Sequence, residues 1–329
     1  MKIGILSFAH LHAEAYIQNL RQIPGVEMIG LADEDAARGQ QFAQQFNAHY
    51  FDSYEALLNA RPDGVVICTE NSKHRALVEM AAEAKVNILC EKPLATNPTD
   101  SQAILDACRK HGVKLMTAFP MRFSTPLIEV KAQLDAGALG QVYCFNATNQ
   151  GECPRHLRAW FVDKELAGGG AVTDHTVHLA DILRWYTGRE VVEVYAQTNH
   201  ILYADEADVE TGGLLMLTFA NGVFASIDCS WNKPNYYATW GGLTFELVTD
   251  RGAVLVDAFK QNLIVHRHAL RRPAWAYWGS DANQAMLNEF VAAIREDRTP
   301  RVTGLDGHRA VEVVAAAYES ARTGQPVKL

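Results

Sequence analysis

Five short apolar runs alternate with helix-forming segments in the first third of the chain, and no other feature constrains the fold as strongly. The runs are almost uninterrupted, as in residues 64–68 (GVVIC), which indicates strands buried on both faces. Buried strands that alternate with helices indicate a parallel sheet with right-handed crossovers. The predicted strands are 3–6, 26–32, 64–68, 86–90 and 113–118, and the predicted helices are 12–22, 35–46, 54–59, 74–84 and 100–111.

The pattern changes after Pro120. Residues 125–136 favour a helix, residues 140–150 favour a strand, and glycines 168–170 open a helix that extends to about residue 186. Alternating segments follow, separated by turns such as the hairpin dipeptide Asn221-Gly222. They predict a broad, mainly antiparallel sheet with strands at 191–198, 214–219, 223–229, 242–248, 253–256 and 262–266, then helices at 282–297 and 305–323.

A chain of 329 residues is long for one core. We predict an α/β domain over residues 1–120 and an α+β domain with a large open sheet over residues 121–329. An alternative for the last helix is that it packs back against the first domain.

Composition and charge exclude several classes of protein. The net charge is −8 and Lys and Arg do not cluster, which argues against a nucleic-acid partner. The apolar runs are too short for a membrane span, and the N-terminus lacks a signal-peptide pattern. Six cysteines without a C-x-x-C pattern indicate reduced, buried thiols. We therefore expect a cytoplasmic protein.

The first predicted strand runs into a turn that raises a question about function. Residues 2–16 (KIGILSFAHLHAEAY) have the strand, turn and helix of a dinucleotide-binding segment. The G-x-G-x-x-G glycines are replaced by Ser7, Ala9 and His12. Ser7 and Ala9 are small enough to leave backbone N–H groups facing an anion, whereas His12 is large. The turn by itself fits either a dinucleotide site or a plain strand and helix.

Asp33 ends the second predicted strand, where a ribose-binding acid is expected. A carboxylate there accepts hydrogen bonds from both ribose hydroxyls and repels a 2′-phosphate, which favours NAD over NADP. The alternative is that Asp33 caps the next helix. Asp35 is an equally good cap, so we favour the ribose-binding role.

Several longer segments resemble one known family. Residues 68–95 (CTENSKHRALVEMAAEAKVNILCEKPLA) match its T-P-N-x-x-H and E-K-P motifs, with Glu70 in place of the usual proline. Residues 118–126 (AFPMRFSTP), residues 158–188 (RAWFVDKELAGGGAVTDHTVHLADILRWYTG) and the C-terminal segment DRTPRVTGLDGHRAVEVVAAAYESARTGQPVKL match its later motifs in the same order. The chain thus resembles the Gfo/Idh/MocA oxidoreductases, named for glucose–fructose oxidoreductase and inositol dehydrogenase.

The resemblance implies an N-terminal Rossmann domain and a C-terminal domain whose open sheet joins subunits, so a homodimer or homotetramer is expected. It also implies that the unusual turn binds dinucleotide and places His10 and His12 near the pyrophosphate or nicotinamide. The alternative for His12 is packing between helix and sheet. The cofactor contacts implied are Ser7, Phe8, Ala9, His10, Asp33, Thr69, Asn71, His74, Glu91 and Lys92.

Oxidation of a secondary alcohol needs a base, a cation beside the developing alkoxide and a nicotinamide within reach. Lys92 ends a parallel strand, where α/β sheets hold ligands, and a cis bond to Pro93 is possible. Asp174 and His178 lie four apart on one predicted helix face. We assign His178 as base, Lys92 as polariser and Asp174 as orienter of His178 and hydroxyl binder. One alternative assigns Lys92 as the base. Two further alternatives are that Lys92 is an ordinary surface lysine and that Asp174 and His178 form a structural pair in the core.

Several other residues near these motifs are candidates for a metal site or for contact with the substrate. His175 and Asp181 join Asp174 and His178 in a metal-like pattern, but one helix does not direct all four to one point, so we predict no metal. Arg122 and Trp160 are predicted substrate contacts, with core packing as the alternative for Trp160. Further candidates are Arg158, and the segment 271–278 as pocket lining or interface.

We predict an NAD-dependent dehydrogenase acting on a secondary hydroxyl of a sugar, a sugar derivative or a cyclitol, with a neutral polyol favoured. Two alternatives stay open. One is a catalytically silent NAD-binding regulatory protein, and the other is a hydrolase or lyase that uses bound NAD for transient oxidation.

Overall fold

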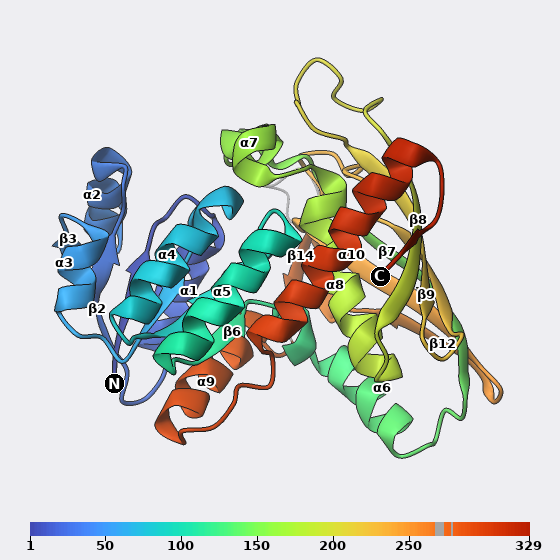
Figure 1. The fold of residues 1–329 in the computed structure, drawn as a ribbon, viewed down its shortest axis with the longest axis horizontal. Helices are drawn as coiled ribbons and strands as arrows, with labels where there is room; N and C mark the ends of the chain where they lie inside the picture. Colours follow the sequence, from blue (N-terminus) through green and yellow to red (C-terminus); the bar gives the residue numbers. More distant parts are fainter. Residues whose placement is uncertain (267–272, 278) are drawn as a thin grey trace.

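The computed structural model describes residues 1–266, 273–277 and 279–329, with residues 273–277 described by their backbone alone. Two large sheets lie side by side, one in the blue-to-teal half of the molecule and one in the yellow-to-orange half (Figure 1). Helix α10 runs between them.

The first sheet has six parallel strands in the order β3-β2-β1-β4-β5-β6. Its strands β1, β4 and β5 are buried at nearly every position, which confirms the prediction from their uninterrupted apolar runs. Strand β3 has only two residues and was not predicted. The bounds are β1 Lys2–Leu6, β2 Glu27–Ala32, β3 Tyr50–Phe51, β4 Gly64–Ile67, β5 Asn87–Cys90 and β6 Leu115–Thr117.

Three of the connecting helices, α2, α3 and α5, begin at residues that the sequence marks as caps. Asp35, Ser53 and Asn97 each accept a backbone N–H in the first turn of the helix that follows. Asp35 is the cap of α2, as expected, so Asp33 is not needed for that purpose. The helices are α1 His12–Arg21, α2 Ala36–Gln45, α3 Tyr54–Asn59, α4 His74–Glu83 and α5 Pro98–His111.

The second sheet has seven strands in the order β12-β11-β7-β10-β9-β8-β15, all antiparallel neighbours except β7 and β10. This confirms the predicted mainly antiparallel sheet, and Gly222 takes a positive φ of 83° in the predicted hairpin turn between β9 and β10. The bounds are β7 Val142–Gly151, β8 Val191–Asn199, β9 Gly212–Phe219, β10 Phe224–Asp228, β11 Gly241–Thr249, β12 Gly252–Asp257 and β15 Val327–Lys328. Residues 262–266 were predicted in this sheet, but in the described part of the chain β13 Asn262–His266 pairs with β14 Pro273–Tyr277 in a separate hairpin.

Helices cover this sheet and connect it to the first. Helix α8 packs against β7, β9 and α10, while α10 also contacts β8 of the second sheet and α5 and β6 of the first layer. The remaining helices are α6 Thr125–Asp135, α7 Lys164–Ala167, α8 Ala171–Thr187, α9 Ala282–Arg295 and α10 Gly304–Thr323. One apolar cluster reaches from Ile3 through Phe119 to Leu215, so buried side chains are continuous between the two sheets.

All six cysteines are free thiols; five are buried and Cys144 is half-buried. Among the described residues, none of the helices combines the length and apolarity that crossing a bilayer requires.

Candidate active site

The strand order brings three predicted motifs to one edge of the first sheet. Strands β1, β4 and β5 are neighbours, and their carboxyl ends are followed by the turn at residues 7–12, by Thr69 to His74, and by Glu91 to Pro93. Ligands of open α/β sheets bind at this edge, beside the point where the strand order reverses. Segments far apart in the sequence therefore meet where a cofactor site is expected.

The turn keeps a glycine-like backbone without its glycines. Ser7 has a φ of 72°, in the left-handed region that glycine favours. Its N–H groups are largely used within the protein: Phe8 N–H donates to Asp33 (2.7 Å), Ala9 N–H to the Ser7 hydroxyl (3.1 Å) and His10 N–H to the Cys68 carbonyl (2.8 Å). In contrast to the sequence expectation, these three N–H groups do not face open space, so anion binding there requires an exchange of partners.

Asp33 is buried at the end of β2 and is already engaged. Arg38 donates to both of its carboxylate oxygens, from Nε at 2.9 Å and from Nη2 at 2.6 Å. Arg38 also lies 4.0 Å from Glu70. The ribose-binding acid predicted from sequence thus carries a cation that the sequence pattern did not reveal.

The segment after β4 is buried, and only some of its polar side-chain atoms have hydrogen-bond partners among the described residues. Thr69 donates to Glu70 (2.8 Å), Asn71 donates to the Ala167 carbonyl (2.9 Å), and His74 Nδ1 pairs with the Pro93 carbonyl (2.9 Å). The Asn71 Oδ1 and His74 Nε2 atoms are buried without a hydrogen-bond partner among the described residues. Because buried polar atoms are normally paired, the Asn71 oxygen fits a bound polar ligand at this edge.

A buried ion pair lies at this edge. It joins Lys92, which follows β5 of the first sheet, to Asp174 on helix α8, which packs on the second sheet. Lys92 Nζ donates to Asp174 Oδ1 at 2.6 Å and to the Asp174 carbonyl at 3.2 Å, and both side chains are almost fully buried. The Lys92–Pro93 peptide bond is cis. Burial would raise the pKa of Asp174, but the Lys92 charge opposes this and holds the pKa of that carboxyl below its usual value.

Asp174 is held from the second domain as well. Its Oδ2 accepts the indole N–H of Trp231 (3.3 Å) and lies 3.5 Å from His175 Nε2. The start of α8 is fixed by Glu210, whose carboxylate accepts the N–H groups of Gly170 and Val172. Sequence reasoning did not single out Trp231 or Glu210, because no short motif marks a partner so distant along the chain.

His178 lies beside this pair without a direct bond to it. Its Nδ1 atom is buried and has no hydrogen-bond partner among the described residues. Burial and then the Lys92 charge hold the pKa of His178 well below its usual value, so the imidazole is neutral. Asp174 bonds to Lys92 and Trp231, and no hydrogen bond joins it to His178 in the described part of the chain, so its expected role as the orienter of His178 has no direct support.

The histidines of the turn lie against Glu91. His12 Nδ1 is 3.0 Å from Glu91 Oε1, and the His10 and His12 ring centroids are 4.3 Å apart. Glu91 is fully buried, and its second oxygen accepts the backbone N–H of Lys92 at 3.1 Å. His12 therefore packs between helix α1 and strand β5, beside the proposed catalytic lysine.

The remaining candidates are engaged in other contacts. Trp160 is buried, stacks on Phe161 and donates its indole N–H to the Ala9 carbonyl (3.0 Å), which ties the second domain to the turn. Arg122 is buried in a two-bond ion pair with Asp181, at 2.6 and 2.7 Å. Arg158 pairs with Glu14 (2.8 Å). The roles of Trp160 and Arg122 as substrate contacts stay predictions. Of segment 271–278, only the backbone of β14 is among the described residues.

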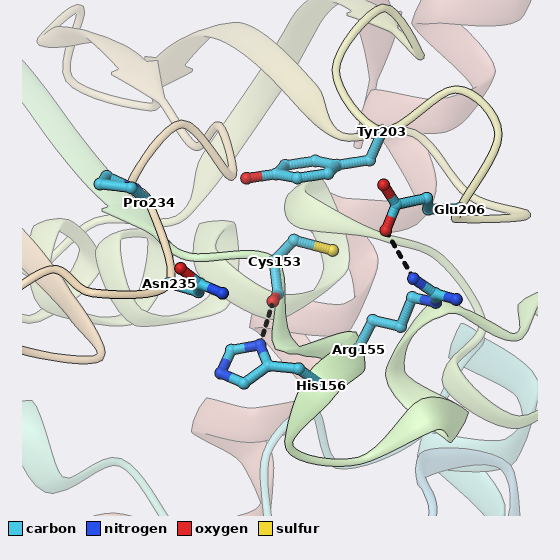
Figure 2. Close-up of a pocket in the computed structure, with 7 residues that line it drawn as sticks. All are labelled: Cys153, Arg155, His156, Tyr203, Glu206, Pro234 and Asn235. Carbon is cyan, nitrogen blue, oxygen red and sulfur yellow. Dashed lines mark hydrogen bonds and ion pairs between the residues drawn. The ribbon is translucent and has the colours of Figure 1, made fainter.

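A cavity of about 320 Å³ lies beside the apolar cluster that contains Trp231 and Cys153. Figure 2 shows the Tyr203 ring across the cavity, the ion pair of Arg155 with Glu206 on one side, and Pro234 and Asn235 on the other. Cys153 lies between them and packs in the same apolar cluster as Trp231, the partner of Asp174. The apolar cluster of Cys153 and Trp231 thus lies between the cavity and Asp174.

Comparison with known proteins agrees with this geometry. A family model described as the oxidoreductase family with an NAD-binding Rossmann fold matches residues 2–119, and one described as the GFO/IDH/MocA C-terminal domain matches residues 127–255.

Relatives match along almost their whole length. Myo-inositol 2-dehydrogenase of Thermotoga maritima is 26% identical, covering 100% of this chain and 98% of the relative. D-xylose 1-dehydrogenase (NADP(+)) 2 of Haloferax volcanii is 29% identical and covers 100% of both. The structure of GenD2 from gentamicin A biosynthesis in complex with NAD has the same fold, with a TM-score of 0.89 and 23% identity over 100% of this chain and 96% of that one. The chain therefore belongs to the Gfo/Idh/MocA family of oxidoreductases.

Proposed function

We propose that the protein is an NAD-dependent dehydrogenase that transfers hydride between nicotinamide and a secondary hydroxyl of a sugar, a sugar derivative or a cyclitol. The observation that carries this proposal is the buried Lys92–Asp174 pair with the neutral His178 beside it, at the carboxyl edge of the parallel sheet. The relatives named for inositol and xylose oxidation support the substrate class.

When bound, the nicotinamide supplies the hydride acceptor. The residues proposed to hold the cofactor are those of the turn, Asp33, Thr69, Asn71, His74, Glu91 and Lys92, and the unpaired Asn71 Oδ1 supports a polar ligand there. Lys92 Nζ is fixed by two hydrogen bonds to Asp174, and a lysine ammonium held there would stabilise a developing alkoxide. Asp174 orients Lys92 rather than His178, and a bound hydroxyl competes for the same carboxylate.

His178 is proposed as the general base, because its low pKa leaves a free nitrogen lone pair at neutral pH. Lys92 as base is the alternative. Lys92 Nζ lies 2.6 Å from the Asp174 carboxylate, and this contact supports the polarising role.

The cavity beside Cys153 is proposed to take part of the substrate. The Tyr203 ring offers an apolar face, and Arg155, Glu206 and Asn235 offer hydrogen-bonding groups, a combination that suits a polyol ring. The positive charge of Arg155 is neutralised by Glu206, so the cavity gives no preference for a phosphate.

We keep the predicted division into domains 1–120 and 121–329, the cytoplasmic location and assembly through the second sheet. The solvent face of that sheet carries exposed apolar side chains, which a second subunit would cover. They are Leu214, Met216, Phe224 and Leu255.

Cofactor preference is the first prediction. We expect NADH to bind more tightly than NADPH, because Asp33 repels a 2′-phosphate. Asp33→Ser removes that charge and frees Arg38, and a hydrogen bond to a charged group contributes about 1.5–3 kcal/mol. The ratio of NADPH to NADH affinity should then rise roughly 10–100-fold. Fluorescence titration with both reduced cofactors measures it, with Asp106→Ser as a control. An unchanged ratio would count against the assignment.

The pH dependence of the rate is the second prediction. A base acts in its neutral form, so a lowered pKa moves the acid limb of kcat/KM to lower pH. We expect kcat/KM to stay on its plateau as the pH falls through the usual histidine value of about 6.5, and to decline only below it. His178→Gln should lower kcat by roughly 10²–10⁴-fold and remove that limb. An acid limb at or above pH 6.5 in the unmodified enzyme would contradict the assignment.

The decisive experiment mixes purified protein with NAD and a panel of neutral sugars, sugar acids and inositols, and follows the absorbance of reduced nicotinamide. Reduction with one substrate class would establish the dehydrogenase. Bound NAD with no reduction across the panel would favour the regulatory or transient-oxidation alternatives.

A further inference from the structure

The turn histidines and Glu91 form a cluster of potential metal ligands. His10 and Glu91 are also proposed cofactor contacts, but neither is assigned a step in the hydride transfer. One potential ligand atom from each of His10, His12 and Glu91 lies within 4.8 Å of the others. His10 and Glu91 are buried and His12 is half-buried. His10 Nδ1 accepts the His12 backbone N–H at 3.2 Å, so this ring nitrogen carries a lone pair.

Glu91 differs from the other buried acids in its partner. Six acidic side chains are buried in the part of the chain that the structure describes, and five of them form an ion pair with a lysine or arginine. These five pairs are Asp33–Arg38, Glu70–Lys73, Asp174–Lys92, Asp181–Arg122 and Glu289–Arg298. Glu91 is instead contacted by the His12 imidazole, which is charged only when protonated, by the Tyr16 hydroxyl and by the Lys92 backbone N–H. The adjacent Lys92 ammonium is directed to Asp174 instead.

A buried carboxylate without a fixed cation is costly, and a bound cation removes that cost. The donor set of two imidazoles and one carboxylate is the one that zinc uses in open three-ligand sites. Tetrahedral bonds of about 2.0–2.1 Å place neighbouring ligand atoms roughly 3.3 Å apart. His12 Nδ1 and Glu91 Oε1, at 3.0 Å, are close to that separation.

We propose that His10, His12 and Glu91 form a binding site for one divalent transition-metal ion, with zinc as the best fit. The ion lies at the base of the glycine-free turn, beside Lys92, whose side chain is directed to Asp174. Two weak contacts of the ligand atoms have to open. The Tyr16 hydroxyl lies 3.5 Å from His12 Nδ1, and the His12 backbone N–H donates to His10 Nδ1 at 3.2 Å. Ligation through either ring nitrogen of His10 gives up that bond. The proposal goes beyond the dehydrogenase function and does not depend on it.

The test measures metal binding directly and needs no substrate. Untagged protein, stripped with a chelator and dialysed, is titrated with Zn²⁺ by calorimetry and with Co²⁺ by visible absorption. We expect one equivalent per chain. His10→Ala, His12→Asn and the isosteric Glu91→Gln should each weaken the affinity by more than about tenfold, whereas the exposed His200→Ala should not.

Circular dichroism and urea unfolding identify any variant that fails to fold, and Glu91→Gln keeps the shape of the side chain, so at least one informative variant remains. Absence of a stoichiometric ion in the unmodified protein overturns the proposal. Equal affinity in folded His12→Asn and Glu91→Gln overturns it too. Nitrogen NMR that shows both ring nitrogens of His12 protonated in the presence of zinc also contradicts the proposal, because the cation beside Glu91 is then imidazolium.

Discussion

Lys92→Met should lower kcat/KM by roughly 10²–10³-fold, because it removes the buried cation placed to stabilise a developing alkoxide. The methionine side chain keeps most of the volume and none of the charge. We expect the loss in kcat, with nicotinamide affinity changed by only a few-fold. Steady-state kinetics on the substrate found in the panel, together with a cofactor titration, measure both quantities.

The same substitution leaves Asp174 buried and unpaired, so a structural loss has to be separated from a catalytic one. The double variant Lys92→Met/Asp174→Asn restores neutrality and should recover stability but not activity. Because Lys92 helps hold the pKa of Asp174 low, the pair contributes stability at neutral pH that is lost as the pH falls below about 4. Lys110→Met, at an exposed position, is the matched control. Full activity in Lys92→Met would reject the polarising role.

Arg122→Met should destabilise the protein by about 3–5 kcal/mol. Arg122 is buried and forms two bonds to Asp181 and a 3.3 Å contact with Asp306, and its guanidinium lies 5.0 Å from the centre of the Trp185 ring. Removing it leaves the buried Asp181 carboxylate without that cation. Urea unfolding followed by tryptophan fluorescence measures the change, read as a lower midpoint with a similar slope.

The exposed Arg322→Met, which breaks only a surface pair with Glu319, should leave the urea midpoint nearly unchanged. The double variant Arg122→Met/Asp181→Leu should recover much of the loss, since both charges are then absent. If Arg122→Met keeps its stability but raises KM, Arg122 is a substrate contact, as predicted from the sequence.

Long, patterned elements were predictable from the sequence because their signal is local. The uninterrupted run at β4 and the caps at Asp35 and Asn97 depend on residues within one or two turns. Strands β3 and β15 have two residues each, too few for a period, and exist only because a neighbouring strand pairs with them.

The residues of the candidate site also fall into two groups, those identified from the sequence and those that only the structure revealed. Lys92, Asp174 and His178 were identified from short motifs, and the structure brings Lys92 and Asp174 into direct contact. Arg38 on Asp33, Trp231 on Asp174 and Glu210 at the start of α8 were not identified. Each of these contacts depends on side-chain geometry or on partners that no short motif links.

By itself, the sequence determined the parallel sheet, the larger, mainly antiparallel sheet and the residues that end their strands. These features depend on hydrophobic periodicity and on capping residues, which lie within an element or next to it. Only the tertiary structure decided which charges pair. It gave Lys92 to Asp174 and left Glu91 facing two histidines, because pairing at a buried edge depends on how strands β1 and β5 and helix α8 converge from segments far apart in the chain.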